Sequence, residues 1–149
     1  MKVRSNTFLR ILGDAIILGS NRPADYPVND SSLWRIIMID GAHNAGILGG
    51  GVLDGDALPG YLLSYNREYD QLEPKRWLGP QYANCSGECR PRLLQVINSD
   101  RVVVRDVQLR NSPDWTFHLF NSTNVLVDNV TVYGDERWPN NDGIDIDSS

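Results

Sequence analysis

Short apolar runs separated by polar turn residues cover most of the chain. Residues 3–19 contain two such runs with Gly13-Asp14 between them, which predicts a strand, a turn and a second strand. Residues 33–39 form a strongly apolar strand, and further short runs follow at 45–48 and 52–54. The pattern therefore predicts a chain built of short β-strands.

From residue 92 the pattern repeats itself. Residues 93–111 align with residues 116–134 without a gap, at a spacing of 23 residues. The apolar positions correspond one for one: Leu94, Val96, Val102, Val104, Val107 and Leu109 match Phe117, Leu119, Val125, Val127, Val130 and Val132. Asn98 also matches Asn121, so we expect an asparagine ladder at a turn.

The same frame extends in both directions. Residues 144–149 match residues 117–122 at a spacing of 27, and residues 44–52 fit once the segment 56–91 is removed. A period of 20 to 50 residues is typical of repeat architectures. Each repeat here holds two or three β-runs and no helix, which predicts an all-β, right-handed parallel β-helix with one coil per repeat. A β-sandwich, the rival fold, gives no reason for such a repeat.

We expect one partial β-helix domain over residues 1–149, with a long loop insertion at 56–91. The insertion has a candidate short helix near residues 61–68. Its aromatic side chains could stack on a sugar ring or pack the loop onto the body: Tyr61, Tyr65, Tyr69, Trp77 and Tyr82. Because the last repeat stops at Ser149, halfway round a coil, we expect the chain to be the truncated front portion of a longer solenoid.

Composition narrows the possible partners. The net charge of −5 does not favour a nucleic-acid partner. No apolar run approaches the roughly 20 residues of a membrane helix. The start of the chain is basic, but Arg10 and Asp14 interrupt the apolar part, so we predict no signal peptide.

The two cysteines, Cys85 and Cys89, suit either a small disulfide loop or two free thiols. A metal site would need two more ligands, and the two histidines, His43 and His118, lie far away in the sequence. We therefore expect no metal and no cofactor.

The end of the chain is the strongest candidate for chemistry. Residues 144–147 alternate isoleucine and aspartate, which predicts a strand with a dry isoleucine face and a wet acidic face. Asp142 precedes this strand beside two amides, where it suits a general base or a water-positioning group. A solvated Asn/Asp turn is the alternative interpretation. We expect Asp145 and Asp147 to be a structural pair or the rim of a cleft, because two water-facing carboxylates have nothing to raise one pKa for acid duty.

With these residues in place, the sequence resembles glycoside hydrolase family 28, the polygalacturonase family of parallel β-helices. The resemblance rests on four segments: Gly19–Pro27, Gly51–Gly55, Asn111–His118 and Asn140–Asp145. The last of these matches the family's Asn-Thr-Asp-Gly active-site motif. It follows the Ser-Pro-x-Trp-Thr segment by one coil, as in the family.

The resemblance implies a hydrolase that cleaves α-1,4-galacturonosyl linkages of pectin with inversion. In such a reaction one carboxylic acid protonates the leaving oxygen while other carboxylates activate a water on the opposite face. By resemblance, Asp142 is catalytic on the water-activating side, and Asn140, Asn141, Trp115 and His118 bind substrate. From their residue types alone, Trp115 could instead be a stacked structural aromatic and His118 a hydrogen-bonded surface imidazole. The resemblance also implies a polysaccharide partner, secretion, and a monomer when complete.

Two departures from the family pattern keep alternatives open. The family's later motifs, a paired Asp, a Gly-His-Gly and an Arg-x-Lys, are absent from this chain, so we expect the fragment alone to be inactive. Asn141 replaces the usual Thr, which allows a modified pectin or a related uronic-acid glycan as substrate. The alternatives are a non-catalytic carbohydrate-binding β-helix, a purely structural solenoid, and a calcium-dependent β-helix that resembles pectate lyase.

Overall fold

The computed structural model describes residues 1–20, 22, 25–26, 34–57, 90–134 and 140–149. Those parts of the chain contain short β-strands and no α-helix. The strands are β1 (Lys2–Val3), β2 (Phe8–Arg10), β3 (Ile16–Leu18), β4 (Arg35–Asp40), β5 (His43–Leu48), β6 (Val52–Asp54), β7 (Arg92–Ile97), β8 (Asp100–Arg105), β9 (Gln108–Arg110), β10 (Phe117–Phe120), β11 (Thr123–Asp128), β12 (Thr131–Tyr133) and β13 (Ile144–Asp147).

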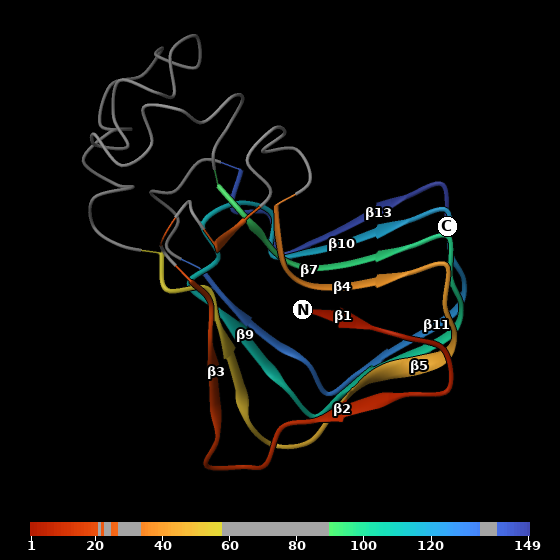
Figure 1. The fold of residues 1–149 in the computed structure, drawn as a ribbon, viewed down its shortest axis with the longest axis horizontal. Coiled ribbons are helices and arrows are strands. Elements are labelled where there is room, and N and C mark those ends of the chain that lie inside the picture. The colour runs from red at the N-terminus through yellow and green to blue at the C-terminus, as the bar shows by residue number, and fades with distance from the viewer. Residues whose placement is uncertain (21, 23–24, 27–33, 58–89, 135–139) are drawn as a thin grey trace, which may run out of the picture.

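The strands form three parallel sheets, and each sheet is made of strands from successive coils. Sheet 1 has the order β1-β4-β7-β10-β13, sheet 2 has β11-β8-β5-β2, and sheet 3 has β12-β9-β6-β3. Four successive coils therefore give one strand to each sheet in turn, and β13 of the next coil extends sheet 1. Figure 1 shows the coils stacked one behind another. The chain is a right-handed parallel β-helix, as the repeat predicted.

The register between coils is the one that the sequence alignment predicted. Leu94 of β7 pairs with Phe117 of β10, 23 residues later. Phe117 pairs in turn with Ile144 of β13, at the predicted spacing of 27. Ala45 pairs with Val102, so the frame also continues across the segment between β6 and β7. The strand β1 was not predicted, because two residues carry no periodic signal.

A left-handed backbone position recurs at one corner of the coil, after sheet 1. Gly41, Asn98, Asn121 and Ser148 occupy equivalent places in four successive coils, and their φ angles are 60°, 48°, 45° and 52°. Glycine and asparagine tolerate this conformation best. Asn121 also donates its Nδ2 proton to Asn98 Oδ1 at 2.8 Å, which confirms the predicted asparagine ladder.

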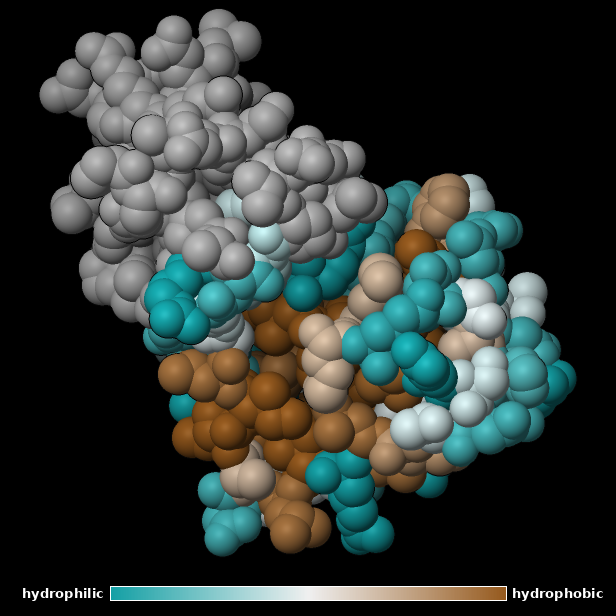
Figure 2. Space-filling model, viewed as in Figure 1, coloured by the Kyte–Doolittle hydropathy of each residue, from teal (hydrophilic) through white to brown (hydrophobic). Residues whose placement is uncertain are grey.

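The core runs along the inside of the coils. Its fully buried members include Leu94, Val96, Val102, Val104, Leu109 and Phe117. Apolar side chains on the edge strands are more exposed, among them Phe8, Ile16 and Leu18 on β2 and β3. Figure 2 shows apolar side chains gathered in the middle of one end of the molecule.

The predicted dry face of the last strand is only partly dry. Ile144 and Ile146 continue the inward columns of Phe117 and Leu119, yet they are 43% and 65% exposed. The reason is that β13 is an edge strand, so another coil covers these side chains on one side only. Most of the predicted insertion at 56–91, with its candidate helix, its aromatics and both cysteines, lies outside the described residues.

Candidate active site

The polar residues at the end of the chain lie on the outer face of sheet 1. Gln95, His118 and Asp145 occupy one row across β7, β10 and β13, because Gln95 pairs with His118 and His118 pairs with Asp145. The next outward row contains Phe120 and Asp147. The register thus brings together His118 and the acidic strand, as the sequence predicted.

The turn before β13 places the two candidate amides and Asp142. The Thr116 N–H donates to the carbonyl oxygen of Asp142 at 3.0 Å, so the coil pairing already starts there and Asp142 is aligned with Trp115. The Thr116 hydroxyl donates to Asn141 Oδ1 at 3.2 Å and fixes that side chain. Asn140 has a φ of 52°, which fits the tolerance of asparagine for left-handed turns. Asp142 itself is exposed and available to solvent.

His118 is not the surface imidazole that was one interpretation of the sequence, because its side chain is only 7% exposed. Nδ1 lies 2.8 Å from Gln95 Nε2, and Nε2 lies 2.8 Å from Asp147 Oδ2. Both ring nitrogens therefore have protein partners. The geometry suits a residue that holds Asp147 in place rather than one that reaches into solvent.

Trp115 is half-buried and contacts one cationic and one polar side chain. The Arg92 guanidinium lies 4.0 Å from the centre of the Trp115 ring, which is a cation–π contact. The His118 ring meets Trp115 edge-on, with ring centres 4.8 Å apart. Arg92 and Arg90 in turn lie 3.7 Å and 3.6 Å from the buried carboxylate of Asp114. These contacts agree with the alternative of a stacked structural aromatic and leave part of the ring exposed.

Asp145 differs from the water-facing carboxylate that its sequence position suggested. Its Oδ2 atom is buried and has no hydrogen-bond partner among the described residues. Burial raises the pKa of the Asp145 carboxyl, and the charge of Asp142 raises it further. Asp147 adds a smaller upward effect, while positive charge on His118 and Arg92 acts in the opposite direction without cancelling the rise. The expectation that nothing raises a pKa in this acidic strand was therefore wrong, because the strand packs against β10.

Three residues at this site were not identified from the sequence: Arg92, Gln95 and Thr116. Gln95 and Thr116 lie in the aligned repeats, and Gln95 precedes His118 by the same 23 residues as the core positions. The repeat was therefore a usable signal for Gln95. The Thr116–Asn141 contact had no such signal, because the loop before Asp142 changes the spacing.

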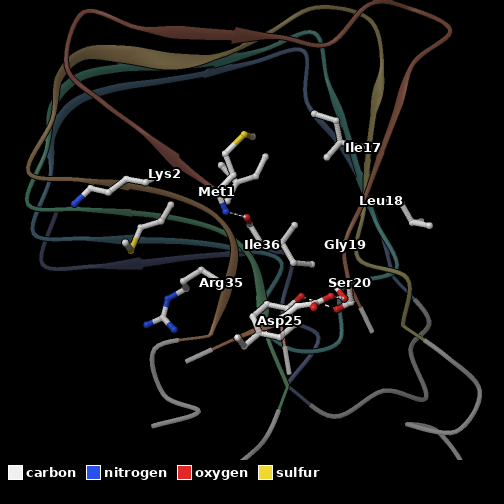
Figure 3. Close-up of a pocket in the computed structure, with 12 residues that line it drawn as sticks. Met1, Lys2, Ile17, Leu18, Gly19, Ser20, Asp25, Arg35 and Ile36 are labelled. Atoms are coloured by element: carbon white, nitrogen blue, oxygen red, sulfur yellow. Dashed lines mark hydrogen bonds between the residues drawn. The ribbon is translucent and has the colours of Figure 1, made fainter. Parts of the chain in front are cut away.

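A hollow lined by described residues lies away from this site, at the first two coils. Figure 3 shows Met1, Ile36 and Gly19 around it, with Asp25 beside Ser20. Arg35 also lines this pocket. Within the described ranges no cluster of His, Cys, Asp or Glu has the geometry of a metal site. The same residues include no helix long and apolar enough to span a membrane.

Solved structures share this fold. A hyperthermoactive exopolygalacturonase from Thermotoga maritima superposes with a TM-score of 0.75 at 23% identity, over 97% of this chain and 38% of its own length. A polygalacturonase from Erwinia carotovora ssp. carotovora superposes with a TM-score of 0.73 at 18% identity, over 97% of this chain and 39% of its own length. The chain thus spans under two-fifths of either enzyme.

Sequence comparison gives the family. A "Probable polygalacturonase" of Vitis vinifera is 37% identical over 59 residues, which are 40% of this chain and 12% of that protein. The family description "Glycosyl hydrolases family 28" matches residues 9–149. That match includes every strand from β3 to β13 and the whole candidate site, and the chain belongs to glycosyl hydrolases family 28.

Proposed function

We propose that the full-length protein encoded by the gene of this chain is a polygalacturonase-type hydrolase. It cleaves α-1,4-galacturonosyl linkages in pectin with inversion of configuration. The observation that carries the proposal is the place of Asn140, Asn141 and Asp142. These residues resemble the family's Asn-Thr-Asp-Gly motif, with Asn141 in place of the Thr, and lie in the turn before β13, where Asp142 is aligned with Trp115 of the preceding coil.

In this proposal Asp142 is the catalytic carboxylate that activates water. Its exposure leaves it accessible to a water molecule and to a glycan lying on sheet 1. Asn141, held by Thr116, and Asn140, held by the turn, line the cleft and orient Asp142 or the sugar. Trp115 offers the exposed part of its ring to a sugar. We assign the general acid to the paired-Asp motif that the family carries after this segment, so this chain alone is inactive.

His118 has a modified role in this proposal. Because both ring nitrogens are already engaged, His118 supports the substrate-binding face instead of contacting the glycan itself. Asn141 in place of the family's Thr alters the cleft beside Asp142, which favours a modified pectin or a related uronic-acid glycan. The family also leads us to propose a secreted monomer that acts outside the cell on cell-wall polysaccharide. The domain in this proposal is a single partial β-helix over residues 1–149, with an insertion at 56–91.

A non-catalytic carbohydrate-binding β-helix is the second candidate. The observation that favours it is the packing of Trp115 against Arg92, which forms a rigid aromatic and cationic surface without needing further catalytic groups. A protein of this kind would bind oligogalacturonides and release no new reducing ends.

The test is an incubation of the full-length protein with de-esterified galacturonan, methyl-esterified pectin and a neutral glucan. Reducing ends are measured, and proton NMR identifies the first anomer released. We expect cleavage of at least one galacturonan, no cleavage of the glucan, and initial release of the β-anomer from the α-linkage. Binding without cleavage would support the second candidate, and initial release of the α-anomer would overturn the inverting mechanism.

A further inference from the structure

Four side chains form a continuous hydrogen-bonded chain across the outer face of sheet 1. The chain runs from Arg35 on β4 to Gln95 on β7, His118 on β10 and Asp147 on β13. Each of these hydrogen bonds crosses one coil boundary. The row of hydrogen-bonded side chains therefore connects the candidate site to Arg35, which is two coils away from His118.

The first link fixes the orientation of the Gln95 amide. Arg35 Nε has only a proton to give, and its partner is Gln95 Oε1. The amide oxygen therefore faces Arg35 and the amide nitrogen faces His118. Gln95 is only 3% exposed, so a flipped amide could not recover these bonds from solvent.

The second link fixes the protonation of His118. Gln95 Nε2 lies 2.8 Å from Nδ1 and Arg92 Nη1 lies 3.4 Å from it, and both groups are donors. Nδ1 must then be the acceptor, which leaves the ring proton on Nε2. Nε2 donates that proton to Asp147 Oδ2 at 2.8 Å. This set of contacts fits an imidazole that carries one proton and donates it to Asp147 in a hydrogen bond.

We propose that His118 is a positioning residue that holds Asp147 as a glycan-hydroxyl acceptor, and that Arg35 sets its tautomer through Gln95. Asp147 has one oxygen held by His118, and its side chain is 54% exposed. An exposed carboxylate accepts hydrogen bonds and repels the carboxylate of a uronic acid. The remaining oxygen of Asp147 therefore selects a free sugar hydroxyl and disfavours a sugar whose hydroxyl is O-acetylated.

The charged groups around His118 fit this arrangement. Asp145 and Asp147 face it from β13, and Arg92 faces it from β7. Positive charge on His118 lowers the pKa of the Asp145 carboxyl, whereas a neutral imidazole does not oppose the burial that raises it.

The tautomer is tested by nitrogen-15 NMR of the histidine side chains at pH 7, and this test does not depend on any enzymatic activity. The full-length protein is used, and His118→Gln identifies the His118 signals. The exposed His43, whose signals His43→Gln identifies, is an internal reference. We expect His118 to be neutral with its proton on Nε2. In Gln95→Glu, a carboxylate faces Nδ1, and we expect a second proton there with the His43 signals unchanged. A wild-type His118 protonated on Nδ1 would overturn the proposal.

The role of Asp147 is tested by kinetics on the full-length protein, and this part rests on the proposed function. We expect Asp147→Ala and His118→Ala each to raise KM on the order of tenfold, with little change in kcat. The double variant should be no worse than either single variant, and His118→Gln, which keeps a donor, should recover part of the loss. Asp147→Ala should also weaken the preference for de-acetylated over O-acetylated galacturonan.

The outcomes separate the two proposals. Absence of cleavage by the wild-type protein would refute the proposed function, while the NMR test of the tautomer would still stand. A large fall in kcat at unchanged KM for His118→Ala would show that His118 acts in the chemical step, and would overturn the positioning role.

Discussion

Thr116 and Asn141 are joined across one coil boundary by a hydrogen bond between side chains. The Thr116 hydroxyl is 3.2 Å from Asn141 Oδ1, and the Thr116 N–H is 3.0 Å from the carbonyl oxygen of Asp142. Thr116 thus holds both the backbone and one side chain of the candidate catalytic turn. Gly134 also lies against Asn141, because an added Cβ there would come within 2.4 Å of the Asn141 amide nitrogen.

Replacing Thr116 with Val should loosen the turn without opening the core. Val has the same shape and keeps the backbone N–H, so only the bond to Asn141 is lost, at about 1 kcal/mol. We expect kcat/KM on galacturonan to fall roughly five- to tenfold in the full-length protein. The exposed Thr131→Val serves as the control and should leave kcat/KM unchanged. Equal rates for the two variants would show that the Thr116 hydroxyl does not position the site.

Asn140 should be required for its backbone conformation. Its φ of 52° is unfavourable for Ala and easy for Gly. We expect Asn140→Ala to lower the free energy of unfolding by about 1 kcal/mol and Asn140→Gly to cost less. Urea denaturation measures both. If activity fails in both variants while the Gly variant stays stable, the Asn140 amide contacts substrate as well.

Asp145 should lower the free energy of unfolding at neutral pH and not in acid. Its pKa is raised in the folded protein, so the folded state disfavours the carboxylate, and stability is lost as pH rises from the ordinary Asp value to the raised one. We expect Asp145→Asn to raise Tm by about 1–2 °C at pH 7, a small shift because solvent screens a half-buried group. The gain should vanish near pH 3. A lower Tm at pH 7 would contradict this account.

The Asp54 carboxylate, unlike that of Asp145, should stabilise the fold at neutral pH. Burial raises the pKa of its carboxyl, but hydrogen bonds from the Asp56 N–H, Arg110 and Asn111 outweigh burial, and the pKa is lowered overall. Arg110 Nε lies 2.7 Å from Asp54 Oδ2, and Asp54 is 6% exposed. We expect Asp54→Asn to cost about 1–3 kcal/mol of unfolding free energy at pH 7.

The pH dependence separates this carboxylate from an ordinary surface one. Because the folded pKa of Asp54 is lowered, its contribution is present above the ordinary Asp pKa and disappears as pH falls through the lowered value. The difference between wild type and Asp54→Asn should therefore shrink in acid, when measured by urea denaturation. The exposed Asp14→Asn is the control, and it should leave the unfolding free energy at pH 7 almost unchanged.

The fold could be predicted because a β-helix repeats its contacts along the sequence. The sequence alignment matched Leu94 with Phe117 and Phe117 with Ile144, and these residues are partners in neighbouring strands of sheet 1. The asparagine ladder followed from the same alignment. The strand β1 did not, because two residues give no period.

The site could be predicted only in part. The alignment put His118 in line with Asp145, and the motif singled out Asp142. The burial of His118 and Asp145 could not be predicted, because it depends on how Arg92, Gln95 and Trp115 pack over the sheet. The alternation of polar and apolar residues predicts that the outward-facing side chains of a strand are solvated, and it gives no information on other side chains that cover them.

The most direct test of the account is the rate of the full-length protein after Asp142→Asn. The substitution keeps the size of the side chain and removes the carboxylate that activates water. We expect galacturonan hydrolysis to fall by about 10²–10⁴-fold, with circular dichroism unchanged and Asp14→Asn as active as wild type. If Asp142→Asn keeps the full rate on every galacturonan tested, Asp142 is not catalytic and the assignment of the site to the turn before β13 is wrong.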